Sequence, residues 1–138
     1  PILSFTAEEI YQLVNKNKNN SVHLEKFFNI PLNWKNEELS NKWIKLKEIR
    51  DVANVSIESK RASKEIGSSL EANLVINLDK KIIEKIKNVD LAELCITSDV
   101  KITENNSDEI FVETIKAEGE KCSVCWKISN EPCKRHSV

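Results

Sequence analysis

The spacing of cysteine and histidine near the end of the sequence constrains this chain more than any other feature. Cys122 and Cys125 form a C-x-x-C pair, and Cys133 and His136 repeat the spacing as C-x-x-H. Two intervening residues let the backbone turn and aim both side chains at one point, so two such pairs offer the four ligands that tetrahedral zinc prefers. Because four protein ligands leave no open position for water, the pattern predicts one structural zinc ion.

Disulfide bonds, or a chance cluster of cysteines, are the alternative explanation of the same residues. Disulfides would leave Cys133 or Cys95 without a convincing partner, and nothing in the sequence suggests secretion. Cys95 lies in a short apolar stretch, and we predict that it is a small buried hydrophobic residue rather than a metal ligand.

Composition sets broad limits on the class of protein. The 138 residues, 40% hydrophobic and 31% charged, suit one or two compact soluble domains. No apolar run reaches transmembrane length and no signal peptide is present, so we expect a cytoplasmic protein with reduced cysteines. The net charge of −1 gives no overall basic field, although a local basic patch can still bind nucleic acid. The chain lacks methionine and begins at Pro1 within a structured pattern, so we expect a piece of a longer protein.

The first half of the chain carries helical signals. Thr6 and Glu9 have the spacing of a capping box, which predicts a helix start at Thr6. Phe27 and Phe28 follow an extended connector, and we predict that both are buried anchors.

A long helix is predicted over residues 36–66, with Gly67 as a left-handed cap. Arg50 interrupts its apolar face, either as a snorkelling or ion-paired side chain or as an arginine held for RNA or a partner surface. The apolar face is predicted to consist of Leu39, Trp43, Leu46, Ala53 and Ile57.

After Gly67 the periodicity changes from helix to strand, because apolar residues alternate strictly over residues 70–78. Asp79 is placed to cap a short helix whose lysines point outward. Residues 94–96, 100–102 and 110–116 are predicted strands, with a turn at 105–108. The sequence therefore predicts an α+β protein that ends in a zinc ribbon or finger.

Four stretches, taken together and in order, resemble the C-terminal third of bacterial isoleucyl-tRNA synthetases. They are PILSFTAEEIYQ (1–12), SVHLEKF (21–27), KEIGSSLEA (64–72) and AEGEKCSVCW (117–126). The resemblance implies that residues 1–67 are the C-terminal portion of a helical anticodon-binding domain. It further implies a small α/β junction domain over residues 68–116 and a zinc-finger module over residues 117–138.

The same resemblance implies what such a chain does. The parent enzyme attaches isoleucine to tRNA(Ile) with ATP, and this region would bind and orient the anticodon stem-loop beside the catalytic and editing domains of the parent. The resemblance also implies a monomeric enzyme. The nucleotide-binding halves and signature loops of the family are not in this sequence, which has only two glycines and no phosphate loop. We therefore expect no catalytic residue here and no activity of the fragment alone.

Two positions depart from the family pattern. The second pair is usually C-x-x-C, whereas here it is Cys133 and His136 with a shorter loop before it; imidazole replaces thiolate at zinc with one less negative charge. An arginine often precedes the second cysteine, and here that residue is Val124. Trp126 matches the family's aromatic residue, and we interpret it as a stacking platform for an unpaired base, or alternatively as a lid over the metal.

A basic and aromatic surface is the predicted RNA contact. Lysines and arginines would meet phosphates, while Trp126 would stack on an exposed anticodon-loop base. Residues 60–64 faintly resemble the KMSKS loop of class I synthetases, but they lie within the predicted helix and serve here as a basic face. The predicted RNA-binding residues are Arg50, Lys60, Arg61, Lys64, Trp126, Lys127, Lys134 and Arg135.

Two other functions fit part of the sequence. A zinc ribbon that binds proteins and no nucleic acid is one. A DNA glycosylase of the formamidopyrimidine type, which uses an N-terminal proline as nucleophile, is the other. Those enzymes continue Pro-Glu, whereas this chain continues Pro1-Ile2 and is too short for their β-sandwich.

Overall fold

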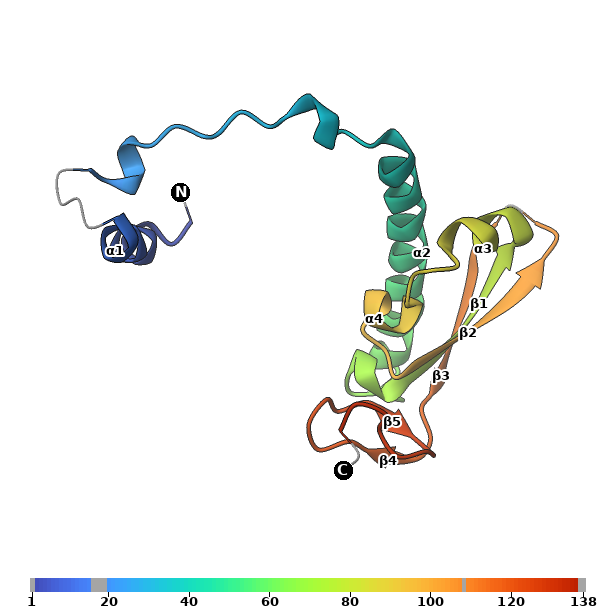
Figure 1. Ribbon diagram of the computed structural model, residues 1–138. Coiled ribbons are helices and arrows are strands. Elements are labelled where there is room, and N and C mark those ends of the chain that lie inside the picture. The colour runs from blue at the N-terminus through green and yellow to red at the C-terminus, as the bar shows by residue number, and fades with distance from the viewer. Residues whose placement is uncertain (1, 16–19, 108, 137–138) are drawn as a thin grey trace. The chain divides into compact units, whose positions relative to one another are not determined.

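The computed structural model describes residues 2–15, 20–107 and 109–136, and it divides the chain into two units, 1–36 and 37–138. Pro1, which would be the nucleophile only in the glycosylase alternative, and Asp108, one end of the predicted turn, lie outside the described residues. Across the described ranges, no helix is both long and apolar enough to cross a lipid bilayer. The predicted α+β class is confirmed, since helices accompany a small sheet (Figure 1).

The first unit consists of α1 (Ser4–Asn15) and two 3₁₀ turns, Val22–Leu24 and Leu32–Trp34. A carboxylate joins the first two elements: Glu8 Oε2 accepts hydrogen bonds from Ser21 Oγ at 2.8 Å and from the backbone N–H of Val22 at 2.9 Å. None of the described residues of this unit is buried. Polar contacts, rather than an apolar core, therefore hold its pieces together.

Two predictions for this unit are wrong. The helix starts before Thr6, because the backbone N–H of Ala7 donates to Leu3 O at 2.8 Å and Leu3 takes a left-handed φ of 57°. Phe27 and Phe28 are exposed, at 102% and 68%. They lie in an extended segment, where Phe28 makes an edge-to-face contact with Trp34.

The long helix α2 (Glu37–Ala62) opens the second unit, and the predicted helix is confirmed with an earlier end. Its terminus is a Schellman motif with Lys64 in the left-handed position at φ 61°, so the predicted cap at Gly67 is wrong. The backbone N–H of Lys64 donates to Arg61 O, and that of Glu65 donates to Lys60 O.

The buried face of α2 differs from the predicted one. Ile49 lies on the buried face, and Arg50 is exposed beside it. Leu39 and Trp43, which were predicted for this face, are 49% and 44% exposed. The buried residues of the helix are Leu46, Ile49, Ala53 and Ile57.

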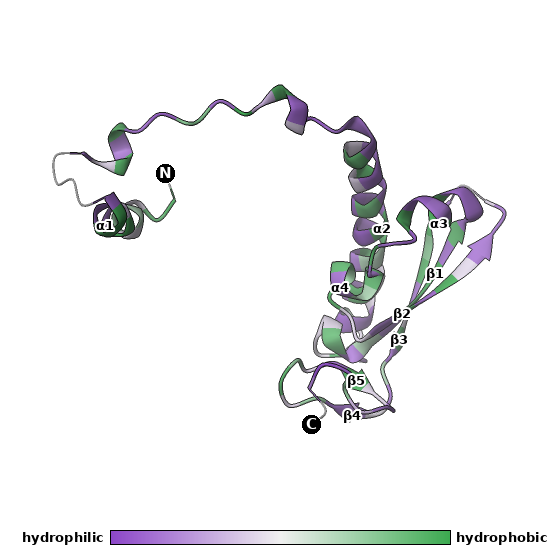
Figure 2. Cartoon of the chain, viewed as in Figure 1, coloured by the Kyte–Doolittle hydropathy of each residue, from purple (hydrophilic) through white to green (hydrophobic). Residues whose placement is uncertain are grey.

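A three-stranded sheet of order β2-β1-β3 packs against α2. The central strand β1 (Ala72–Asp79) pairs parallel with β2 (Asp99–Asn105) and antiparallel with β3 (Phe111–Lys116). The predicted alternation is confirmed along β1, whose every second residue is buried, and Figure 2 shows this strand as largely apolar. A hydroxyl pair, Ser56 Oγ and Thr114 Oγ1 at 2.7 Å, joins α2 to β3 within the apolar interface.

Two short helices connect β1 to β2. Asp79 accepts from the N–H of Lys81 and caps α3 (Lys80–Ile86) as predicted. Residues 94–96, a predicted strand, belong to α4 (Leu91–Cys95) and its left-handed cap, because Asp90 accepts from the N–H groups of Ala92 and Glu93. Cys95 is 3% exposed in the core, as predicted.

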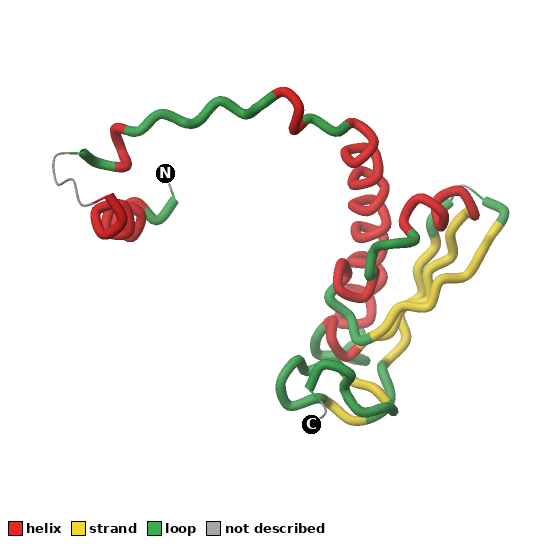
Figure 3. Tube along the Cα trace, viewed as in Figure 1, coloured by secondary structure: helices red, strands yellow, loops and turns green. Residues whose placement is uncertain are grey.

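A small hairpin of β4 (Glu120–Lys121) and β5 (Ile128–Ser129) follows the sheet. We call residues 117–136 the Cys/His module. Most of it is loop and turn (Figure 3), and among its described residues only Ala117 is buried.

Candidate metal centre and RNA-facing residues

Four side chains of the Cys/His module converge on one point. The ligand atoms of Cys122, Cys125, Cys133 and His136 all lie within 4.8 Å of one another. Cys122 Sγ lies 3.6 Å from His136 Nδ1, Cys133 Sγ lies 3.4 Å from the same nitrogen, and the sulfurs of Cys125 and Cys133 are 3.7 Å apart. This cluster can hold a metal ion.

These separations fit tetrahedral coordination. Bonds of about 2.3 Å to sulfur and about 2.0 Å to nitrogen place neighbouring ligands about 3.8 Å apart for two sulfurs and about 3.5 Å apart for sulfur and nitrogen. The three cysteines are free, and a sulfur–sulfur distance of 3.7 Å is far from the bond length of a disulfide. The donor set of three thiols and one imidazole is compatible with zinc, and Cys95 is not part of it.

The surroundings of the first cysteine pair shift the pKa values of its two thiols in opposite directions. The N–H groups of Cys125 and Val124 point at Cys122 Sγ and lower the pKa of that thiol to about 6. For Cys125, the N–H of Lys127 lowers the pKa, but desolvation and the neighbouring sulfurs outweigh it and the pKa is raised. A cluster that readily supplies one thiolate is suited to a cation, since metals bind the deprotonated sulfur.

One glycine is required where the chain enters the hairpin. Gly119 has φ of 119°, and a Cβ atom there would lie 2.3 Å from the carbonyl of Ser129 and 2.6 Å from Asn130 N. No side chain fits between these strands, because real Cβ contacts do not approach so closely. Sequence reasoning did not single out this residue.

Trp126 stands at the surface beside the first cysteine pair. It has a left-handed φ of 65°, its N–H donates to Cys122 O at 3.0 Å, and it is 58% exposed. The ammonium group of Lys121 lies 5.7 Å from the centre of the indole ring, a cation–π distance. The turn that carries the metal ligands therefore also fixes the direction of the tryptophan.

The basic residues of the module fall into two groups. Glu93 of α4 accepts an ion pair from Lys127 Nζ at 2.8 Å and another from Arg135 Nη2 at 3.2 Å. The hydrogen bond from Lys127 is the main cause that lowers the pKa of the Glu93 carboxyl. Lys134 is exposed, and within the described ranges it makes no ion pair.

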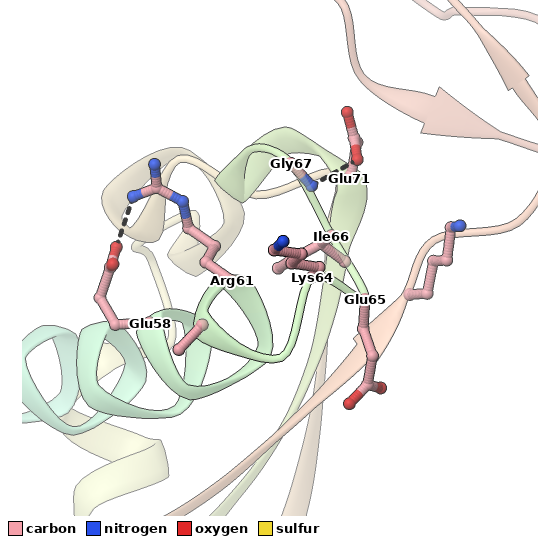
Figure 4. A pocket seen from close by; sticks show the side chains of 9 residues that line it. Glu58, Arg61, Lys64, Glu65, Ile66, Gly67 and Glu71 are labelled. Atoms are coloured by element: carbon pink, nitrogen blue, oxygen red, sulfur yellow. Dashed lines mark hydrogen bonds and ion pairs between the residues drawn. The ribbon is translucent and has the colours of Figure 1, made fainter.

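The basic residues at the end of α2 are also largely paired. Lys60 Nζ lies 2.7 Å from Glu65, and Arg61 Nη1 lies 2.7 Å from Glu58. Arg61 and Lys64 line a hollow of about 620 Å³ together with the carboxylates of Glu58, Glu65 and Glu71, and Figure 4 shows these side chains. Lys127, Lys134 and Arg135 line a different hollow, and Arg50 is exposed on α2. Apart from Arg50 and Trp126, the predicted residues thus form two separate basic regions, each interleaved with acidic groups.

Comparison with known proteins identifies the class to which this chain belongs. Residues 1–76 match the family described as the anticodon-binding domain of tRNA ligase. The match extends over more than half of the chain, so the protein belongs to the anticodon-binding domain family of tRNA ligases.

Relatives of known name resemble almost the whole chain. It is 60% identical over 137 residues to the isoleucine–tRNA ligase of Pelagibacter ubique, covering 99% of the chain and 15% of the relative. It is 37% identical over 142 residues to the isoleucine–tRNA ligase of Bartonella henselae, covering 95% and 14%. The enzyme of that name from Agrobacterium fabrum is also 37% identical over 142 residues, covering 95% and 15%. The resemblance that four stretches indicated is confirmed, and the chain spans about one-seventh of the length of these relatives.

Proposed function

We propose that this chain is the tRNA-binding C-terminal region of an isoleucine–tRNA ligase, which receives the anticodon stem-loop of tRNA(Ile). The observation that carries the proposal is the family match of residues 1–76 together with relatives of that name along nearly the whole chain. Family membership favours this function over a DNA glycosylase or a protein-binding zinc ribbon. The parent would attach isoleucine to tRNA with ATP in the cytoplasm as a monomer, through catalytic and editing domains carried elsewhere.

The tRNA-binding region would consist of three parts. Residues 1–67 would be the C-terminal portion of the anticodon-binding domain, residues 68–116 a junction domain, and residues 117–138 a zinc-finger module. Alone, the chain would neither activate isoleucine nor charge tRNA. Isoleucine-dependent pyrophosphate exchange above background by the isolated chain would contradict this expectation.

Zinc is the proposed ion of the metal centre, with Cys122, Cys125, Cys133 and His136 as its ligands. The tetrahedral separations and the sulfur-rich donor set support it. Bound zinc would close the loops of the module around one point, and all four protein ligands would leave no place for a reactive water. The ion would therefore be structural.

Trp126 is the proposed stacking platform for an anticodon-loop base. Its exposure of 58% favours a platform over a lid, since a lid would turn its ring toward the metal and away from solvent. Lys121 would keep the indole in place from one side of the ring. The proposed phosphate contacts are Arg50, Lys60, Arg61, Lys64 and Lys134. Lys127 and Arg135, which the sequence also predicted for this role, are paired with Glu93.

The test is the affinity of the full-length ligase for tRNA, measured across a salt series with cognate and non-cognate tRNA. Trp126→Ala is expected to weaken binding by about 1–3 kcal/mol with an almost unchanged salt slope, since stacking releases no counterions. Lys134→Ala is expected to weaken all tRNAs alike and to reduce the slope by about one unit.

Zinc content must be measured in each variant as the control. A Trp126→Ala enzyme that keeps its zinc and binds like the wild type would make the tryptophan a lid only. The proposed function itself would be contradicted if the wild-type ligase bound cognate and non-cognate tRNA with equal affinity. It would also be contradicted if that affinity did not depend on salt.

A further inference from the structure

The Cys/His module meets the α/β part of its unit at a serine hydroxyl. Ser98 Oγ donates to Leu70 O at 2.5 Å and accepts from the backbone N–H of Ile128 at 2.7 Å. Ser98 itself is fixed, because its N–H donates to Ala72 O at 2.9 Å at the start of β1. One half-buried hydroxyl therefore links the entry to the central strand with β5 of the module.

A carboxylate makes a second link on the same side. Glu93 of α4 holds two cations of the module, Lys127 at 2.8 Å and Arg135 at 3.2 Å. These cations are close to the two ligand pairs in sequence: Lys127 lies two residues after Cys125, and Arg135 lies between Cys133 and His136. A single exposed ion pair contributes little, but here two pairs share one carboxylate and the Lys127 side chain is only 27% exposed.

We propose that Glu93 is a positioning residue, which with Ser98 forms a latch that fixes the orientation of the Cys/His module on the α/β part of the chain. Lys127 and Arg135 act through Glu93 and not as phosphate contacts. The module then offers RNA its outward groups, Trp126 with Lys121 beside it and Lys134. This inference deepens the proposed function and rests on it only where RNA is involved.

The docking half of the proposal is tested without RNA, by amide hydrogen exchange of the zinc-loaded chain. Glu93→Gln keeps the size of the side chain, leaves the acceptor of Ile128 in place and removes the charge that both cations share. Exchange of the Ile128 amide is expected to become roughly threefold to tenfold faster, because two weak ion pairs no longer oppose the separation of the Cys/His module from the α/β part of the chain.

The amide of Cys122 is the internal reference, since it donates to Lys127 O within the module. Its exchange is expected to stay unchanged, which separates undocking of the module from its unfolding. Lys134→Gln is the matched control for Arg135→Gln, one residue away: only the second variant is expected to accelerate Ile128. Unchanged protection of Ile128 in Glu93→Gln, or equal acceleration of Ile128 and Cys122, would overturn the latch.

The RNA half is tested by salt-dependent tRNA binding of the full-length ligase. Lys127→Gln and Arg135→Gln are expected to leave the salt slope almost unchanged, whereas Lys134→Gln lowers it by about one unit. Glu93→Gln is expected to bind no more tightly than the wild type and with the same slope.

An increase of affinity and slope in Glu93→Gln would mean that Lys127 and Arg135 were phosphate contacts restrained by the carboxylate, and it would overturn their assignment to the latch. A slope lowered by Lys127→Gln would do the same. A wild-type ligase that binds no tRNA would refute the proposed function alone, because the exchange experiment still decides whether the latch exists.

Discussion

The α/β core and the Cys/His module belong to one unit but are held together by different means. In the core, aliphatic residues of α2, β1 and the short helices are almost fully buried, as Leu46, Ile49 and Ile76 illustrate at 0% exposure. In the described part of the module only Ala117 is buried, and its two strands have two residues each. The difference teaches that the core carries its own stability, whereas the module has, in place of a core, four convergent side chains that can hold a metal ion.

Removal of the metal is expected to show the largest difference between the stability of the module and that of the core. A chelator is expected to unfold the module and leave α2 and the sheet intact, because a structural zinc ion supplies on the order of 10 kcal/mol of folding free energy at such a site. Elemental analysis should find one zinc per chain, and NMR spectra before and after chelation should lose only the signals of residues 117–136. A coordination shell that contains Cys95, or a disulfide among the ligands, would contradict the assignment.

Truncation of the core is the reciprocal experiment. Ile76→Ala is expected to lower the free energy of unfolding by about 2–5 kcal/mol, since it opens a cavity beneath α2. Denaturant unfolding with zinc present measures the loss. Val75→Ala, one residue away on the opposite face of the sheet, where the side chain is only partly buried, is the matched control and should lose clearly less. Equal losses would mean that burial against α2 is not what stabilises β1.

Backbone geometry inside the module gives a smaller effect. Gly119→Ala is expected to destabilise the module by about 1–3 kcal/mol, because the new Cβ meets the backbone of Ser129 at a positive φ. Gly67→Ala serves as the control, since its nearest neighbours are 3.5 Å away in the flexible side chain of Glu71. The zinc affinity of the two variants checks the expectation, and a similar loss in both would contradict it.

The smallest effect lies at the end of α2. Lys64→Gly is expected to stabilise the core by up to roughly 1 kcal/mol, because a glycine adopts the left-handed cap without steric strain. Lys64→Ala removes the same charge but keeps the strain, so it should bring no such gain. Thermal unfolding of both variants distinguishes strain from charge, and equal melting temperatures would exclude strain as the cause.

Where a single local pattern decides the structure, the sequence was sufficient to predict the element or the site. The alternation over residues 70–78 predicts the buried face of β1, and Asp79 predicts the start of α3. Spacing alone also brings Cys122, Cys125, Cys133 and His136 into one candidate site, because short pairs fix the direction of their own side chains.

Where two signals compete, the sequence was not sufficient. Residues 94–96 read as a strand because three apolar residues in a row have no helical period, yet Asp90 caps a helix four residues earlier. The role of Glu93 could not be predicted, since its contact with Lys127 spans 34 residues and no spacing rule connects them. Arg50 was placed on the apolar face of α2 by alternating steps of four and three, whereas a step of three from Leu46 brings Ile49 to the buried face instead.

The order of strands in the sheet has a consequence for how the chain reaches its native state during synthesis. The central strand β1 is translated before both of its neighbours, and its register with β3 joins Ala72 to Lys116. More than forty residues after the start of β1 must therefore be synthesised before β3 can pair with β1 and complete the sheet that packs against α2. Pairings between residues so distant in sequence form slowly. The candidate metal ligands, Cys122 to His136, come shortly after β3 in the chain, so a metal ion would be captured by a chain whose core has only just become able to form.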